Sequence, residues 1–183
     1  MKHKSLLIRW PILSLLALPL LASVAGSSWR DYALGTSFDV QVESQHRNLY
    51  PPGQTPTTET SMEHWKLVKK DDKTATFEVT SGDQKTEETL PLVLEPQPVS
   101  GNTAQGPEER TRIEVDRETI TTPLGTFECT RIHRRRSMND AGGENVEWRA
   151  VGFPVAIRTY SKWGHKQQED IETRTVVRFT RGK

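Results

Sequence analysis

The chain has 183 residues, with 25 Lys and Arg against 24 Asp and Glu, so its formal net charge is +1. This near balance excludes a general polyanion binder, because nucleic-acid affinity comes largely from many cationic contacts to phosphates. Apolar residues make up 33% of the chain, which is enough for one modest core and makes a large apolar cavity hard to supply. The single cysteine, Cys129, rules out an internal disulfide.

The first 25 residues have the three parts of a secretory signal. The leader begins with three positive charges, at Lys2, Lys4 and Arg9. An apolar run over 10–22 follows, and small residues precede a cleavage site after Ala25. A membrane anchor is the alternative, but the run is shorter than the roughly 20 apolar residues of a spanning helix, and Pro11 and Pro19 interrupt it. We therefore expect export to the periplasm or the extracellular space, with no transmembrane segment after cleavage.

Removal of this signal leaves residues 26–183, the length of one domain, with 22 basic residues against 24 acidic ones. At its start, Ser27–Leu34 allows a short helix with Trp29 and Ala33 on one side. Apolar residues then alternate with polar ones in short runs separated by turn residues at intervals of roughly 8–12 residues. In chain order, the runs lie at 38–42, 65–67, 75–79, 90–94, 113–120, 127–129, 146–150, 155–157 and 176–179.

This pattern predicts an all-β domain, because strand side chains alternate between the two faces of a sheet. We expect a single curved antiparallel sheet or open half-barrel of about eight to ten strands. Two Pro-rich segments, Asn48–Ser61 and Glu95–Glu109, are predicted to be surface loops.

The densest run of charge consists of Arg131, His133, Arg134, Arg135 and Arg136. In a strand, Arg131, His133 and Arg135 point to one face, and Arg134 and Arg136 point to the other. One interpretation is a site for an anion such as a lipid headgroup, a polysaccharide or a phosphate. These five residues are therefore candidate ligand-binding residues.

The other interpretation of this run is a salt-bridged strand pair. A hairpin that pairs Arg134 with Glu147 would place His133 opposite Trp148 and Arg135 diagonal to that indole, within cation–π range. The remaining candidate for ligand binding is Trp163, which lies in the expected turn Lys162–His165.

No catalytic, metal or cofactor site is predicted. Cys129 and His133 are four residues apart on one expected strand, about 13 Å along the backbone, too far for a nucleophile and its base. His46, His64 and His165 do not show metal-ligand spacing with each other or with His133. Phosphate-binding loops and serine-nucleophile motifs are also missing from the sequence. Enzymatic activity thus has no support from motifs, although converging carboxylates remain an open alternative.

Two segments resemble a known pattern. Thr121–Thr130 has the spacing T-x-P-x-G-x-F, and Glu147–Arg158 is an expected hairpin that contains Trp, Ala, Gly and Val in that order. The pattern is similar to that of exported bacterial β-sheet proteins, many of them uncharacterised, whose sheets resemble the open half-barrel of the LolA/LolB lipoprotein carriers. The resemblance covers residues 110–180 and implies a curved, half-barrel sheet.

These observations favour an exported, non-enzymatic envelope protein that binds a ligand or an envelope protein through its curved sheet. A periplasmic carrier of lipid or lipoprotein acyl chains is the first alternative, and it predicts an apolar cleft. An exported hydrolase or metal-dependent enzyme is the second, and it predicts histidines and carboxylates that converge in one pocket.

Overall fold

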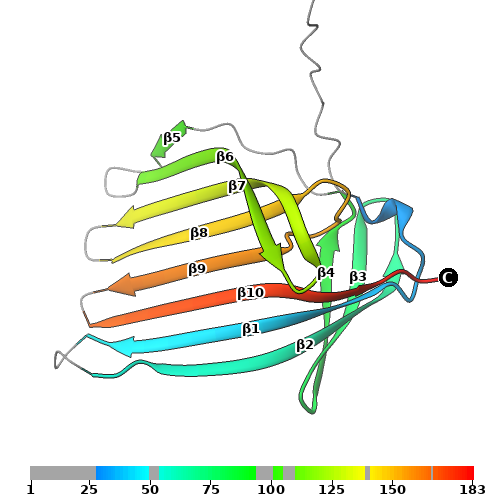
Figure 1. Cartoon of the computed structure of the whole chain (residues 1–183), viewed down its shortest axis with the longest axis horizontal. Coiled ribbons are helices and arrows are strands. Elements are labelled where there is room, and N and C mark those ends of the chain that lie inside the picture. Colours follow the sequence, from blue (N-terminus) through cyan, green and yellow to red (C-terminus); the bar gives the residue numbers. More distant parts are fainter. Residues whose placement is uncertain (1–27, 50–53, 94–100, 105–109, 139–140, 166) are drawn as a thin grey trace, which may run out of the picture.

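The computed structural model describes residues 28–49, 54–93, 101–104, 110–138, 141–165 and 167–183. Within them, ten strands form one antiparallel sheet in the order β4-β3-β2-β1-β10-β9-β8-β7-β6-β5 (Figure 1). The strands are β1 (Ser37–Asn48), β2 (Thr57–Lys70), β3 (Thr74–Ser81), β4 (Gln84–Pro91), β5 (Gly101–Ala104), β6 (Arg110–Thr122), β7 (Gly125–Met138), β8 (Ala141–Ala150), β9 (Arg158–His165) and β10 (Gln168–Thr180). The prediction of a curved, open, all-β sheet is confirmed.

The sheet consists of two meanders joined along one seam. Strands β1 to β4 form one meander and β5 to β10 the other, and β10 pairs with β1 in the middle of the sheet. Ser37 pairs with Thr180 at one end of this seam and Asn48 with Gln168 at the other, with one irregularity between Asp39 and Val40. The first and last strands of the chain are therefore neighbours, and the sheet edges are β4 and β5.

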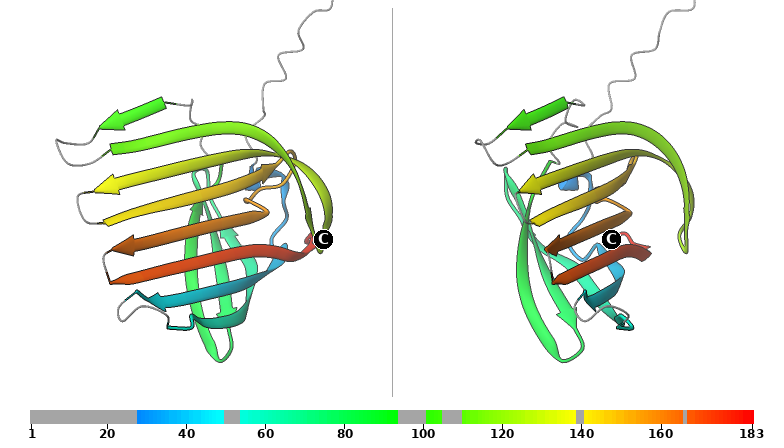
Figure 2. Two further views of the ribbon diagram at one scale, coloured as in Figure 1. Left: turned by 60° about the vertical axis from the view of Figure 1, so that its left-hand side comes forward. Right: turned by 90° about the vertical axis from the view of Figure 1, so that its left-hand side faces the viewer.

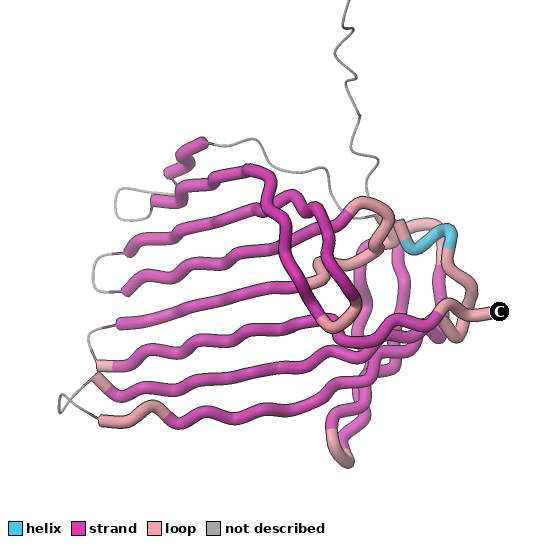
Figure 3. Tube along the Cα trace, viewed as in Figure 1, coloured by secondary structure: helices cyan, strands magenta, loops and turns pink. Residues whose placement is uncertain are grey.

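The helix expected over Ser27–Leu34 is a single 3-10 turn, η1 (Trp29–Asp31), the cyan segment in Figure 3. The Ser28 side chain caps this turn by accepting a hydrogen bond from the Arg30 N–H at 3.1 Å. The turn cannot lengthen because Tyr32 has extended backbone angles, and because the Trp29 N–H already donates to the Leu92 carbonyl at 2.8 Å.

The main hydrophobic core lies where this turn packs on β1, β2, β3 and β10. Its buried members are Trp29, Tyr32, Phe38, Val40, Val42, Leu67, Ala75, Phe77, Val79, Leu92 and Val176. Aromatic rings dominate, since Trp29 lies 4.6 Å from Phe77 and 5.8 Å from Phe38 between ring centroids. The core thus occupies one end of the strands on one face of the sheet.

A second, smaller core contains Ile120, Cys129, Ala150 and Ile157. Figure 2 shows the β6–β7 hairpin curving over at this end of the sheet. Phe153 links the two cores, because its ring centroid lies 5.5 Å from that of Phe127 and 5.2 Å from that of Phe179. The turn predicted at Pro123–Gly125 joins the two strands of this hairpin, and Gly125 has a φ of 130° there.

The predicted loops are partly strand. Residues 57–61 extend β2, because Thr57 pairs with His46 and Ser61 with Val42. Residues 101–104 form the edge strand β5. The proposed signal at residues 1–25 lies outside the described residues. In the part of the chain that is described, no helix has the length and apolar character needed to span a membrane.

Candidate functional site

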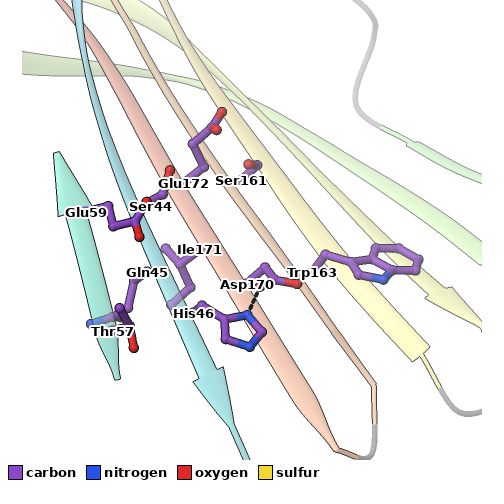
Figure 4. A pocket seen from close by; sticks show the side chains of 10 residues that line it. All are labelled: Ser44, Gln45, His46, Thr57, Glu59, Ser161, Trp163, Asp170, Ile171 and Glu172. Carbon is purple, nitrogen blue, oxygen red and sulfur yellow. Dashed lines mark hydrogen bonds and ion pairs between the residues drawn. The ribbon is translucent and has the colours of Figure 1, made fainter. Parts of the chain in front are cut away.

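A polar groove lies on the face of the sheet that bears Phe38, Val40 and Val42, which we call the core face. The groove has a volume of about 450 Å³. It is lined by Ser44, Gln45, His46, Thr57, Glu59, Ser161, Trp163, Asp170, Ile171 and Glu172 (Figure 4). The groove is therefore made by β1, β2, β9 and β10, near the ends of β1 and β9.

Strand register explains why these side chains meet. Directly paired residues on antiparallel strands point to the same face. His46 pairs with Thr57 on one side and with Asp170 on the other, and Asp170 in turn pairs with Trp163. These four residues form one row across four strands.

A second row lies two residues nearer the core. Ser44 pairs with Glu59 and with Glu172, and Glu172 pairs with Ser161. The two rows lie about 7 Å apart along the strands, and neighbouring strands are about 4.8 Å apart. Together the rows form a floor of hydroxyls and carboxylates with one indole.

His46 and Asp170 form the closest pair in the groove. Nδ1 of His46 lies 2.5 Å from Oδ1 of Asp170. This hydrogen bond raises the pKa of His46 above its usual value of 6.5. The other ring nitrogen, Nε2, lies 3.4 Å from the side-chain amide nitrogen of Gln168. In the neutral ring, Nδ1 donates to Asp170 and Nε2 accepts from Gln168.

Trp163 forms a flat wall of the groove. Its indole packs on the backbone of Gly143, the residue paired with it on β8. An ideal Cβ at Gly143 would lie 2.5 Å from Cε3 and 3.1 Å from Cζ3 of the indole. The six-membered ring thus lies against Gly143, while Trp163 remains 42% exposed. Trp163 is a large aromatic surface open to a ligand.

The carboxylates of the groove differ in their partners. Glu172 lies 3.5 Å from Arg174, and the same guanidinium also pairs with Glu63. The Glu59 carboxylate makes no hydrogen bond or ion pair to any residue that the structure describes. With His46 neutral, the groove has an excess of negative charge.

The arginine run lies on β7, and its side chains alternate between the faces as predicted. Arg134 is on the core face, and Arg131 is on the opposite face. Carboxylates from neighbouring strands meet both residues. Arg131 donates to Asp116 at 2.9 and 2.6 Å, and Arg134 donates to Glu147. These contacts match the salt-bridged interpretation of the run.

The other members of the run lie in similar surroundings. Nε2 of His133 lies 2.9 Å from Glu144, and Nε of Arg135 lies 3.9 Å from the same carboxylate. Arg136 pairs with Gly143 in the β7–β8 ladder. None of the five basic residues lines the polar groove, whereas Trp163, the sixth candidate, does.

The predicted register of the β7–β8 hairpin is wrong by two residues. Arg134 pairs with Asn145, and Trp148 pairs with Arg131 instead of His133. The ladder closes at Met138 and Ala141, so the connection between these strands is shorter than expected, and it sets the register. Arg134 still reaches Glu147 diagonally.

The shifted register also changes the surroundings of Trp148. Its indole N–H donates to Glu118 at 2.8 Å, and Arg135 pairs with Glu144. The arrangement expected between Arg135 and the Trp148 indole therefore does not form, because the two residues are too far apart along the hairpin.

Cys129 has a structural position. It is 3% exposed in the second core, and burial raises the pKa of its thiol. Its Sγ lies 3.7 Å from the Phe127 carbonyl oxygen. Across the described ranges, no three His, Cys, Asp or Glu side chains are arranged to hold a metal ion.

Sequence reasoning missed His46, Asp170, Glu59 and Glu172. They lie on β1, β2 and β10; the β1–β2 pairing places Glu59 beside Ser44, and the β1–β10 pairing brings in Asp170 and Glu172 from the far end of the chain. A partial signal was present, because Ser44 and His46 continue the alternating phase of Phe38, Val40 and Val42. That phase shows that the face becomes polar, but not which residues lie opposite.

No family model matches the chain, and no curated protein matches it either. Among solved structures, the chain is similar to a proposed lipoprotein of Parabacteroides distasonis ATCC 8503, with a TM-score of 0.39 and 11% sequence identity. The similarity covers 85% of this chain and 99% of the other.

Proposed function

We propose that the protein is an exported, non-enzymatic envelope protein that binds a polar ligand in the groove of its core face. The proposal rests on the exposed indole of Trp163, which packs on Gly143 in the same row as the His46–Asp170 pair. Ligand sites combine an apolar or aromatic surface with a few polar groups that fix orientation, and the groove has both. The predicted signal over residues 1–25 supports the envelope location.

The groove fits a polar ligand better than an acyl chain. A lipid carrier needs an apolar cleft, but the side chains here include Glu59, Asp170 and Glu172. Transfer of charged carboxylates from water into contact with hydrocarbon is unfavourable unless they are paired. The resemblance to the LolA/LolB carriers therefore remains a proposal about the shape of the sheet, and acyl-chain transport is not the function that we favour.

A hydrolase is the second candidate, because His46 and Asp170 are paired as in a catalytic dyad. A nucleophile would have to hydrogen-bond to Nε2 of His46, where the Gln168 amide lies instead. Ser44 is on the same face, but it is two residues away along β1, about 7 Å. No hydrogen bond joins it to His46 among the described residues. Binding is thus better supported than catalysis.

Native mass spectrometry of the protein purified from its own cells tests the proposal. We expect an added mass that is lost on denaturation and is reduced in Trp163→Ala. Trp148→Phe is the matched control, because Trp148 lies on the opposite face of the sheet and is bonded to Glu118. A bare protein mass, or an added mass that is equally present in Trp163→Ala, would contradict binding in this groove.

A further inference from the structure

We propose that the ligand of the polar groove is a small organic polyamine, with ammonium groups held by the Trp163 indole and by the carboxylates of Glu59, Asp170 and Glu172. This inference rests on the proposed binding function and adds the chemical class of the ligand. It follows from the charge, the aromatic surface and the spacing of the groove.

Charge is the first argument. Three carboxylates and one histidine line the groove, and no Lys or Arg lines it. The Glu59 carboxylate has no partner among the described residues, and the Glu172 carboxylate has only the 3.5 Å contact with Arg174. An anionic ligand would meet repulsion from these groups, whereas an ammonium group would complete their ion pairs.

The other cations of the core face are engaged or lie farther away. Arg174 is shared between Glu63 and Glu172, and Arg134 is paired with Glu147. Arg136 is paired with Gly143, the residue beneath the Trp163 indole, so it lies on the side of the indole away from Asp170. The acidic part of the groove therefore lies between β9 and β2, on the Asp170 side of the indole.

The indole supplies the second argument. Trp is the strongest aromatic partner of a cation, and an ammonium group within about 6 Å of the ring centroid is attracted by the face of the ring. Trp163 is paired directly with Asp170, and its indole extends away from Asp170 over Gly143 (Figure 4), so a ligand bound along this row passes both the carboxylate and the ring. The ring packs against Gly143, and a side chain that is already packed loses less rotamer freedom when a ligand binds.

Spacing favours several ammonium groups over one. Asp170 and Glu172 are about 7 Å apart along β10, and Glu59 lies two strands away from Glu172, about 10 Å. A linear polyamine can place one ammonium group at the indole and Asp170, and another between Glu172 and Glu59. A single small amine would satisfy only one of these positions.

Spermidine is the probe for this proposal, and a neutral oligosaccharide, maltohexaose, is the matched comparison. Binding is measured by isothermal titration calorimetry with the protein purified from its own cells. We expect spermidine to bind and maltohexaose not to bind. Spermidine affinity should fall roughly tenfold in the Glu59→Gln, Glu172→Gln double variant, because each exposed ion pair contributes modestly.

Two further variants separate the contributions. Trp163→Ala should weaken spermidine binding about fivefold, with Trp163→Phe in between, because Phe retains a weaker ring face. The Glu87→Gln, Glu88→Gln double variant, on the exposed edge strand β4, removes the same two charges away from the groove and should leave the affinity unchanged. The affinity should also fall as salt is added.

The outcomes distinguish failure of the polyamine class from failure of the binding function. Binding of maltohexaose that depends on Trp163, without binding of spermidine, would overturn the polyamine class and leave the binding function intact. Spermidine binding that is equal in the groove double variant and in the Glu87→Gln, Glu88→Gln double variant would show nonspecific attraction and also overturn the class. If neither spermidine nor maltohexaose binds, and mass spectrometry detects no added mass that depends on Trp163, the binding function itself is overturned.

Discussion

The indole of Trp163 occupies the space that a side chain at Gly143 would fill. A Cβ at that position would lie 2.5 Å from Cε3 of the indole and 2.9 Å from the carbonyl oxygen of Lys162. Glycine weakens a strand because it has no side chain to pack, and it is found where another group approaches closely. Glycine at position 143 thus lowers the strand propensity of β8, but it leaves the space in which the Trp163 indole packs.

Gly143→Ala should displace the Trp163 indole, because neither the ring nor the backbone carbonyl can move away without cost. We expect a loss of about 1–3 kcal/mol in the free energy of unfolding and a red shift of tryptophan emission. Gly164→Ala is the control, since its nearest neighbour would be 3.4 Å away, an ordinary contact. Equal unfolding curves for the two variants would show that Gly143 is not required by the indole.

Phe77→Ala should strongly destabilise the fold. Phe77 is fully buried and packs against the rings of Trp29, Phe38 and Trp65. Removal of a buried Phe side chain costs about 3–5 kcal/mol, which denaturant unfolding measures directly. Val151→Ala, at a position that is 83% exposed, should change stability by less than about 0.5 kcal/mol. A small effect of Phe77→Ala would mean that this core is not the main source of stability.

The His46–Asp170 pair should make stability depend on pH. The pKa of His46 is raised in the folded state, so its stabilising contribution is fully present below the unfolded value of 6.5. That contribution is lost as the pH rises through the raised pKa. Urea unfolding should therefore show a larger difference between the native protein and His46→Gln near pH 6 than near pH 8.5.

His165→Gln provides the control for this comparison, because His165 has no carboxylate partner among the described residues. Its effect on stability should change little over the same pH range. A difference between native protein and His46→Gln that grows with pH would contradict the pairing.

Spermidine affinity should rise over the same pH range. Loss of the proton from His46 removes a positive charge next to Asp170 and leaves the groove more acidic. Calorimetric titrations at about pH 6 and pH 8 should show this increase in the native protein. His46→Gln should bind with nearly the same affinity at both values, and a persistent pH effect in that variant would place the responsible group elsewhere.

Cys129 should react slowly with iodoacetamide in the folded protein and rapidly in urea. Burial hides the thiol and also raises its pKa, so little thiolate is present near neutral pH. Mass spectrometry of the alkylated protein measures both rates, and non-reducing electrophoresis should show monomer alone. Fast labelling of the folded protein, or a disulfide-linked dimer, would show that the second core opens.

Much of the fold follows from local sequence pattern. The alternation of Phe38, Val40 and Val42 determined both that β1 is a strand and which of its faces is buried. This works because side chains along a strand point alternately to the two faces, so each residue reveals the environment of its own position. The turn at Pro123–Gly125 and the split of the arginine run between two faces follow from equally local rules.

Register and strand order required the tertiary structure. A register shift of two residues keeps every side chain on its face, so the apolar pattern could not distinguish Arg134 opposite Glu147 from Arg134 opposite Asn145. The length of the connection between β7 and β8 decided between them, and composition alone did not reveal it.

The groove depends most strongly on information that the sequence lacks. Residue types and alternation determined that the distal part of the core face is polar and that Trp163 is a candidate contact. The pairing of β1 with β10 joins residues that are more than 100 positions apart in the chain. Only this pairing placed His46 beside Asp170 and brought the Glu172 carboxylate near Glu59. Alternation along a strand indicates the environment of each residue. Which residues of β1 and β10 pair with each other is determined by the packing of the whole sheet.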